Sequence, residues 1–254
     1  MYQKWYSNNI IYLKIMSALK NKIVLITGAS KGIGRATALM FAKEGAKIAL
    51  LARDKQALIL LQQEIQILSS VAEIFVGDVS DETFIQSTIA EVINVFGTID
   101  IVINNAGFGI FKLSEETTTE DWDNIFATNV KGTFLVSKAV TPIMKQNNCG
   151  HIITIASDVA KRVFAGGALY CASKYAQDAY SMALRKELRQ YEIKVSVVYS
   201  GLVDSHFHTE PQGDNSHEHW LKIEDMANAI VYIASRPKHV VIDELMIHPL
   251  CQEY

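Results

Sequence analysis

The sequence is poor in cysteine and has no long apolar run. Its three cysteines, Cys149, Cys171 and Cys251, form no CxxC pair and have no spacing typical of a metal site. So few thiols fit a reducing compartment, which predicts a cytoplasmic protein. No apolar stretch approaches the roughly 20 residues of a transmembrane helix, so we expect no membrane association.

The sequence also lacks an excess of charge of either sign. Its net charge is -3, with 20% charged and 49% hydrophobic residues. This balance does not indicate the basic surface of a nucleic-acid-binding protein. The composition and the length of 254 residues fit one large α/β domain with a substantial core.

Repeats, low-complexity tracts and Pro/Gly/Ser-rich linkers are absent, which predicts a single domain over residues 22–254. Residues 1–21 look different and are expected to be an N-terminal extension. The stretch MYQKWYSNNIIYLKI has no long apolar core and no small-residue cleavage site, so it does not read as a signal peptide. Its alternatives are a disordered arm, a misassigned translation start upstream of Met16, and a membrane-surface anchor.

Short apolar runs alternate with helical patterns along the chain. Strands are predicted at residues 23–27, 47–52, 72–76, 101–103, 151–156, 194–199 and 240–242, and helices at 34–44, 55–68, 82–96, 119–146, 170–190 and 224–235. Several strands are continuous apolar runs, as strands buried on both faces should be. The alternation predicts a doubly wound, mostly parallel seven-stranded sheet with helices on both faces, whose ligands bind beyond the carboxyl ends of the strands.

The stretch TGASKGIG at residues 27–34 joins the first strand to the first helix, with glycines at Gly28, Gly32 and Gly34. Glycines let a backbone turn approach a pyrophosphate, and the helix that follows offers unpaired N–H groups and its positive dipole end. A P-loop is excluded, because Ile33 stands where GxxxxGK[ST] needs its second glycine. The alternative is a tight turn with a helix packed close to it.

This turn resembles the TGxxxGxG nucleotide turn of the short-chain dehydrogenase/reductase family. The resemblance extends from about residue 22 to about residue 203 and rests on further motifs in order: Asp78-Val79, the NNAG of residues 104–107, Asn129, Ser157, and Tyr170 with Lys174 in YCASK. It implies a Rossmann-type fold and a nicotinamide cofactor. The cofactor-binding residues that it implies are Gly28, Ser30, Lys31, Gly32, Ile33, Gly34, Arg53, Asp78, Val79, Asn105, Ala106, Gly107, Tyr170, Lys174, Gly201 and Val203.

The end of the second strand, KIALLARD, bears on the cofactor. Ala52 stands where an NAD-dependent relative would carry Asp, and Arg53 follows it. An acid there binds the ribose 2′-OH, whereas a basic residue accommodates a 2′-phosphate. Lys31 occupies a position that is often basic in NADP-preferring relatives, so we expect NADP(H). The alternative makes both cations solvated surface charges and Asp54 the ribose ligand.

Tyr170 and Lys174 lie four residues apart and therefore share a helix face. A nearby ammonium lowers a tyrosine pKa from its usual value of about 10. The resemblance implies that Tyr170 is the acid/base, that Lys174 tunes it and binds the nicotinamide ribose, that Ser157 holds the substrate oxygen, and that Asn129 supports a water. Ser157 as a hydrolase nucleophile is disfavoured, because AIASDVA lacks the G-x-S-x-G elbow.

The later sequence departs from the family. Ser200 replaces the usual proline and Ser205 stands near the usual threonine, while Gly201 remains and the Val203 amide is expected to bind the carboxamide. The stretch 204–220 is predicted to be a mobile, solvated lid over a shallow, polar pocket. Its four histidines, His206, His208, His217 and His219, form only i,i+2 pairs, so no metal is predicted.

The sequence thus predicts an NADP-dependent oxidoreductase (EC 1.1.1.-), a carbonyl reductase or alcohol dehydrogenase for a small, polar, 3-oxo or 3-hydroxy acid-like substrate. The alternatives are a non-catalytic NADP(H)-sensing protein, a 3-oxoacyl-thioester reductase, and a membrane-associated partner protein. The helices at 119–146 and 170–190 carry apolar residues beyond the need of one sheet face. In relatives they form a four-helix interface, which predicts a homodimer or homotetramer.

Overall fold

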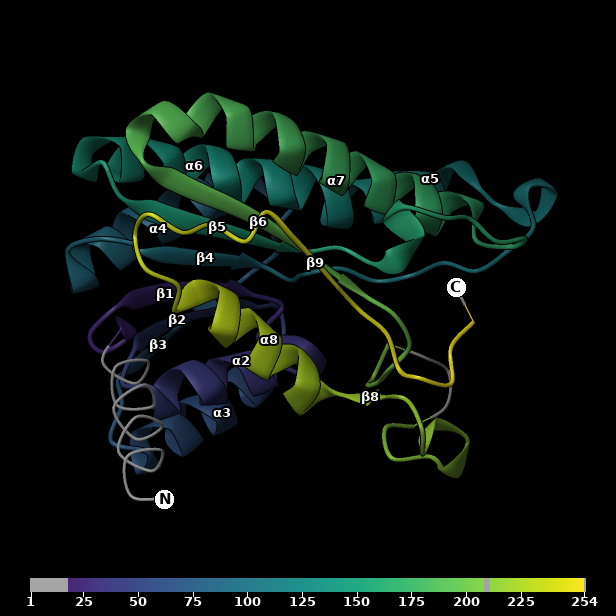
Figure 1. Cartoon of the computed structure of the whole chain (residues 1–254), viewed down its shortest axis with the longest axis horizontal. Helices are drawn as coiled ribbons and strands as arrows, with labels where there is room; N and C mark the ends of the chain where they lie inside the picture. Colours follow the sequence, from purple (N-terminus) through teal and green to yellow (C-terminus); the bar gives the residue numbers. More distant parts are fainter. Residues whose placement is uncertain (1–17, 208–210, 254) are drawn as a thin grey trace, which may run out of the picture.

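The structure is a computed structural model that describes residues 18–207 and 211–253 (Figure 1). Residues 1–17, which make up most of the predicted N-terminal extension, lie outside the described residues, as does His208 of the predicted lid. Within the described part, no helix combines the length and the apolar character needed to cross a membrane.

Seven parallel strands form one sheet in the order β3-β2-β1-β4-β5-β6-β9. Their bounds are β1 Ile23–Thr27, β2 Lys47–Ala52, β3 Ala72–Val76, β4 Ile101–Asn104, β5 Gly150–Ile155, β6 Ile193–Ser200 and β9 Glu244–Ile247. Strands β1 and β5 are buried along their whole length, as their apolar runs predict. The predicted fold class is confirmed. The short strands β7 (Val203–Asp204) and β8 (Leu221–Lys222) form a separate pair.

Helices cover both faces of the sheet. In Figure 1, α2 (Gly32–Lys43), α3 (Lys55–Ile67) and α8 (Ile223–Ala234) lie on one side, and α6 (Gly132–Asn147) and α7 (Ala168–Leu188) lie on the other. Helix α4 (Glu82–Phe96) packs with the second group, and α5 (Thr119–Ile125) packs against α7. Two apolar cores result, one on each face. The short helical turns are η1 (Ser114–Glu116), η3 (Asp158–Ala160), η4 (Arg189–Tyr191) and η5 (Asn215–His217).

Strand order reverses at β1, whose neighbours are β2 on one side and β4 on the other. Chain crossovers therefore leave toward opposite faces at this point and open a crevice at the carboxyl ends of the strands. The loops after β1, β3, β4 and β5, which carry the glycine turn, Asp78-Val79, most of NNAG and Ser157, begin at this edge.

Two predicted elements are wrong in detail, while the other ends fall within two residues of prediction. Residues 240–242 form no strand, because the Val240 N–H bonds the Pro237 carbonyl in a turn at 2.9 Å. Pairing with β6 begins only where the Val197 N–H reaches the Asp243 carbonyl, at 3.0 Å. The predicted helix 119–146 is interrupted by the π-helical segment η2 (Phe126–Lys131).

Candidate active site

A cavity of about 820 Å³ opens at the carboxyl ends of the central strands. Its lining comes from the loops that follow β1, β2, β3, β4, β5 and β6, so segments far apart in the sequence meet there. Every predicted cofactor-binding or catalytic residue lines it except Gly34 and Asn129, which are buried behind its wall.

The three glycines of the turn have different structural reasons. Gly28 and Gly32 have left-handed φ values of 63° and 55°, which favour glycine. A Cβ on Gly34 would lie 2.3 Å from the Gly28 carbonyl oxygen, so Gly34 is required for packing. A Cβ on Gly32 would meet only Ser205, at 3.8 Å. Gly32 therefore leaves open backbone facing the cavity at the start of α2.

This turn fits a pyrophosphate. Helix α2 begins there, and its N-cap residue, Lys31, makes no side-chain capping hydrogen bond. The first N–H groups of the helix therefore face the cavity without a side-chain acceptor from the cap, and the positive end of the helix dipole adds to them.

The NNAG motif holds the glycine turn in place. The Asn105 side-chain amide donates to the carbonyls of Thr27 and Gly28, at 3.0 and 3.2 Å. The Thr27 hydroxyl accepts from the backbone N–H groups of Asn105 and Ala106, both at 3.0 Å. The loop after β4 and the turn after β1 thus form one unit.

The residues after β2 surround the predicted 2′-phosphate position. Asp54 caps α3, since its Oδ1 accepts from the Ala57 N–H at 3.0 Å, so this carboxylate is engaged in the helix. Arg53 is exposed and lies 3.5 Å from Asp78. Burial raises the pKa of Asp78, but hydrogen bonds from Ser80 and the charge of Arg53 outweigh it and leave the pKa lowered.

Ser157, Tyr170 and Lys174 are buried together at the other end of the cavity. The Lys174 ammonium nitrogen donates to the Ile155 carbonyl at 3.0 Å and lies 5.8 Å from the centre of the Tyr170 ring. The Ser157 hydroxyl has acceptors in Asp158 Oδ1 at 3.0 Å and the Ser200 carbonyl at 3.3 Å. Strand β5 and helix α7 therefore bring the predicted residues into one site.

Asn129 lies in the π-helical segment and holds the loop after β4. Its Oδ1 accepts from the Phe108 N–H at 3.0 Å, and its Nδ2 donates to the Phe108 carbonyl at 2.9 Å and to the Ser173 hydroxyl at 3.0 Å. Single π turns are frequent at functional sites. Here the turn carries the fully buried Asn129 amide, which joins the Phe108 backbone to α7.

Burial governs the proton affinities of Tyr170 and Lys174. It raises the pKa of Tyr170; the Ser157 hydroxyl opposes this shift and the Asp158 charge adds to it. It lowers the pKa of Lys174 to about 7. The expected lowering of the Tyr170 pKa is therefore wrong for the protein alone, because loss of solvation outweighs the distant ammonium. Tyr170 is thus a protonated donor at neutral pH.

Sequence reasoning overlooked a polar cluster around Asp158. Both Nε and Nη2 of Arg162 donate to Asp158 Oδ2, at 2.8 and 2.5 Å, and Gln252 Nε2 donates to it at 2.7 Å. Gln252 Oε1 accepts from the Leu202 N–H at 2.8 Å, and a Cβ on Gly201 would lie 2.2 Å from that oxygen. The available signal was an acid directly after Ser157 with an arginine four residues later.

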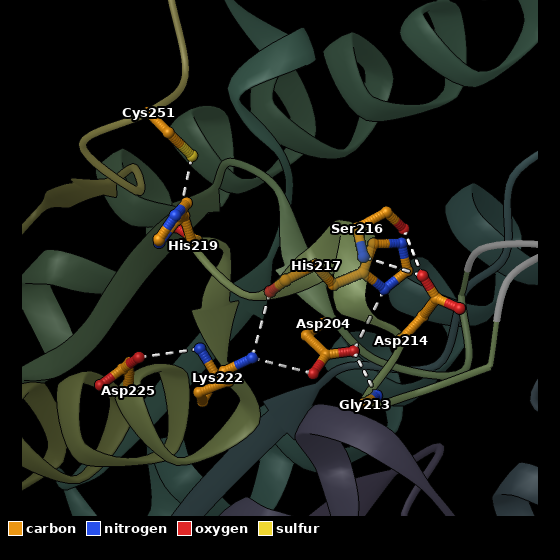
Figure 2. A network of polar contacts seen from close by, with 9 residues as sticks. All are labelled: Asp204, Gly213, Asp214, Ser216, His217, His219, Lys222, Asp225 and Cys251. Atoms are coloured by element: carbon orange, nitrogen blue, oxygen red, sulfur yellow. Dashed lines mark hydrogen bonds and ion pairs between the residues drawn. The ribbon is translucent and has the colours of Figure 1, made fainter.

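The lid is anchored by a second network (Figure 2). Asp204 Oδ1 accepts from the Gly213 N–H at 2.9 Å and lies 3.2 Å from His217 Nδ1, while Lys222 donates to Asp204 Oδ2 at 3.1 Å. His217 is 1% exposed and stacks on Trp220. A wholly solvated lid is therefore a wrong expectation. Within residues 18–207 and 211–253, no three His, Cys, Asp or Glu side chains group as metal ligands.

A model of the short chain dehydrogenase family matches residues 22–215. The chain belongs to this family. An uncharacterised oxidoreductase of Staphylococcus epidermidis is 34% identical over 92% of this chain and 100% of its own length. This chain is thus an oxidoreductase of the short-chain dehydrogenase type.

Solved structures agree with this assignment. An alcohol dehydrogenase of the archaeon Thermococcus sibiricus, complexed with 5-hydroxy-NADP, is 29% identical with a TM-score of 0.87, over 92% of this chain and 98% of that one. An NAD+-bound xylitol dehydrogenase is 26% identical with a TM-score of 0.80, over 91% of this chain and 99% of that one. Relatives of this fold therefore bind either nicotinamide dinucleotide.

The buried amine of Lys174 is expected to cost stability. In the unfolded chain the Lys174 amine has a pKa of about 10.5, whereas in the folded chain its pKa is about 7. Between these pH values the unfolded chain binds more protons, so the wild type gains stability as pH rises. Lys174→Met should therefore raise the free energy of unfolding by about 2 kcal/mol at neutral pH. This difference between variant and wild type should become smaller toward pH ~10. Thermal unfolding across pH checks this.

The matched control is Lys43→Met, which removes an exposed amine on α2 and should leave unfolding nearly unchanged at every pH. If Lys174→Met and the wild type have the same stability, or if their difference in stability stays constant with pH, the effect of burial is contradicted.

Proposed function

We propose that this chain is an NADP(H)-dependent carbonyl reductase or alcohol dehydrogenase. The observation that carries the proposal is one cavity lined by both the open glycine turn and the buried Ser157, Tyr170 and Lys174. The cofactor, when bound, supplies or accepts the hydride. The chain would hold its pyrophosphate at Gly32 and the start of α2.

Protein groups would handle the proton and the oxygen. Tyr170 would give its hydroxyl proton to the carbonyl oxygen, while Ser157 holds that oxygen by a hydrogen bond. Lys174 would contact the cofactor ribose, and Asn129 would support a water beside it. A neutral, buried tyrosine beside a hydroxyl supports this division of roles.

NADP(H) is favoured over NAD(H) by charge. Lys31 and Arg53 both line the cavity on the β2 side, and Asp54, the rival ribose ligand, is engaged in capping α3. A 2′-phosphate would pair with these cations through charge-assisted hydrogen bonds. The NADP-type ligand named for the archaeal relative also supports this choice.

The rival functions have less support. A cofactor-sensing protein without turnover does not need the intact set of Ser157, Tyr170 and Lys174. The predicted small 3-oxo or 3-hydroxy acid, and a 3-oxoacyl thioester, remain predictions from sequence. The aromatic lining beside Tyr170 does not favour the polar pocket on which the acid prediction rested.

We also propose a cytoplasmic homodimer or homotetramer that pairs through α6 and α7. The exposed Phe134, Tyr175 and Met182 on these helices support an interface, and the three unpaired cysteines are compatible with a reducing compartment.

Light scattering should give a mass of two or four chains of 28.3 kDa. Met182→Glu should shift this mass toward one chain, because it places a charge in the apolar contact. A wild-type monomer mass at all concentrations would contradict the assembly.

The reaction is tested by following NADPH absorbance with a panel of aldehydes and ketones. The wild type should oxidise NADPH with at least one of them. Tyr170→Phe should lower kcat by about 100-fold or more, because a general acid is removed. Binding of NADPH to this variant, measured by fluorescence, should remain. NADPH binding without turnover of any carbonyl compound would favour the sensing function.

The cofactor choice is tested with Lys31→Ala and Arg53→Ala. Each should lower kcat/KM for NADPH by about tenfold and leave the value for NADH nearly unchanged, because each removes a hydrogen bond to a charged group. Lys55→Ala removes an exposed cation at the start of α3 and serves as control. A wild type that prefers NADH would refute the NADP(H) assignment.

A further inference from the structure

Aromatic rings surround the proposed proton donor. Phe111 meets the Tyr170 ring edge-on, with centroids 5.5 Å apart, and the Phe207 ring is tilted against the Tyr170 ring at 5.4 Å. Phe164 extends the group beyond Phe111, at 6.0 Å. We call Phe111, Phe164 and Phe207 the aromatic wall. All three line the cavity, and they come from the loops after β4, η3 and β7.

The backbone beside the aromatic wall has glycines at positions where any side chain would collide with the rings. A Cβ on Gly109 would lie 2.6 Å from the Phe111 ring and 2.8 Å from the Phe207 ring. A Cβ on Gly167 would lie 2.4 Å from the Phe164 ring. The missing side chains of Gly109 and Gly167 therefore leave the space that these rings occupy. Ring distances of 5.4 to 6.1 Å are those of favourable aromatic pairs.

The wall remains available to a ligand. Phe111 and Phe164 are 49% and 41% exposed although they face a cavity. Large apolar side chains left open together usually mark a binding surface. Binding pockets commonly combine such walls with a few convergent polar groups, here the hydroxyls of Ser157 and Tyr170.

Charge in this half of the cavity disfavours an anionic substrate. The nearest guanidinium, Arg162, is paired with Asp158 through two hydrogen bonds. Lys174 is buried and donates to the Ile155 carbonyl. Among the described lining residues, the other cations, Lys31 and Arg53, lie on the β2 side, which leaves only the exposed imidazole of His206 near the wall. The charges of Asp158 and Arg162 offset each other, so this pair gives a substrate carboxylate little net attraction.

We infer that the substrate is an uncharged aldehyde or ketone with an aromatic ring, or the corresponding alcohol, and that the ring binds against Phe111 and Phe164. This inference rests on the proposed function. In reduction, the carbonyl carbon gains a hydride from NADPH and the oxygen gains the Tyr170 proton. The products are the alcohol and NADP+, and the tyrosinate recovers a proton from water.

Benzylacetone and levulinate test this inference. Both are methyl ketones with the same two-carbon spacer, and they end in a phenyl ring and a carboxylate, respectively. The wild type should show a kcat/KM at least about tenfold higher for benzylacetone. With NADP+ present, so that no turnover occurs, saturation-transfer NMR should show binding of benzylacetone and weaker binding of levulinate.

Variants of the wall separate ring binding from chemistry. Phe111→Ala and Phe164→Ala should each raise KM for benzylacetone by about tenfold, with kcat less affected, and should raise KM for butan-2-one, which has no ring, by a clearly smaller factor. Tyr232→Ala removes an exposed ring on α8 outside the cavity and should change neither value. Retained NADPH binding shows that each variant is folded.

The outcomes are distinguishable. Levulinate turned over or bound as well as benzylacetone, or a benzylacetone KM unaffected by both wall variants, overturns the inference and leaves the reductase function standing. Benzylacetone bound against the wall without turnover of any carbonyl compound leaves the inference about the ring standing and refutes the proposed reaction.

Discussion

The site depends on the close contact between the glycine turn and Asn105. The Gly34 and Gly28 backbones approach to a distance that leaves no room for a Cβ, and the Asn105 amide bonds the carbonyls of Thr27 and Gly28 across the join of β1 and β4. This contact fixes the start of α2 relative to the loop after β4. Because that loop also carries Gly107 and Phe111, this one contact positions both the glycine turn and part of the aromatic wall.

Burial is the second constraint, and it acts against stability. Tyr170 and Lys174 are taken from water and their pKa values move in opposite directions, so that each is held in its neutral form more than it would be in solution. A folded protein has only a small margin of stability, and an active site commonly uses part of it. The apolar strands β1 and β5 on each side of the site supply compensating burial.

Much of this arrangement could be predicted from the sequence. Continuous apolar runs place the strands because such runs occur where both faces of a sheet are covered, and the motifs after them gather because parallel strands end at one edge. The prediction of a strand at 240–242 is wrong because β-branched residues also occur outside strands: Val240 closes a turn on Pro237, and pairing with β6 begins only at Asp243. The π segment around Asn129 and the contacts of Asp158 with Arg162 and Gln252 depend on tertiary partners, which helical periodicity does not report.

The strand order has a consequence for how long the folded protein persists. Strands β1, β2 and β3 form one half of the sheet and β4, β5, β6 and β9 the other, and the two halves join along β1 and β4. A nucleotide bound across this seam would stabilise only chains in which both halves have docked, by mass action. The fraction of folded chains, and hence their resistance to proteolysis, would then follow the supply of cofactor.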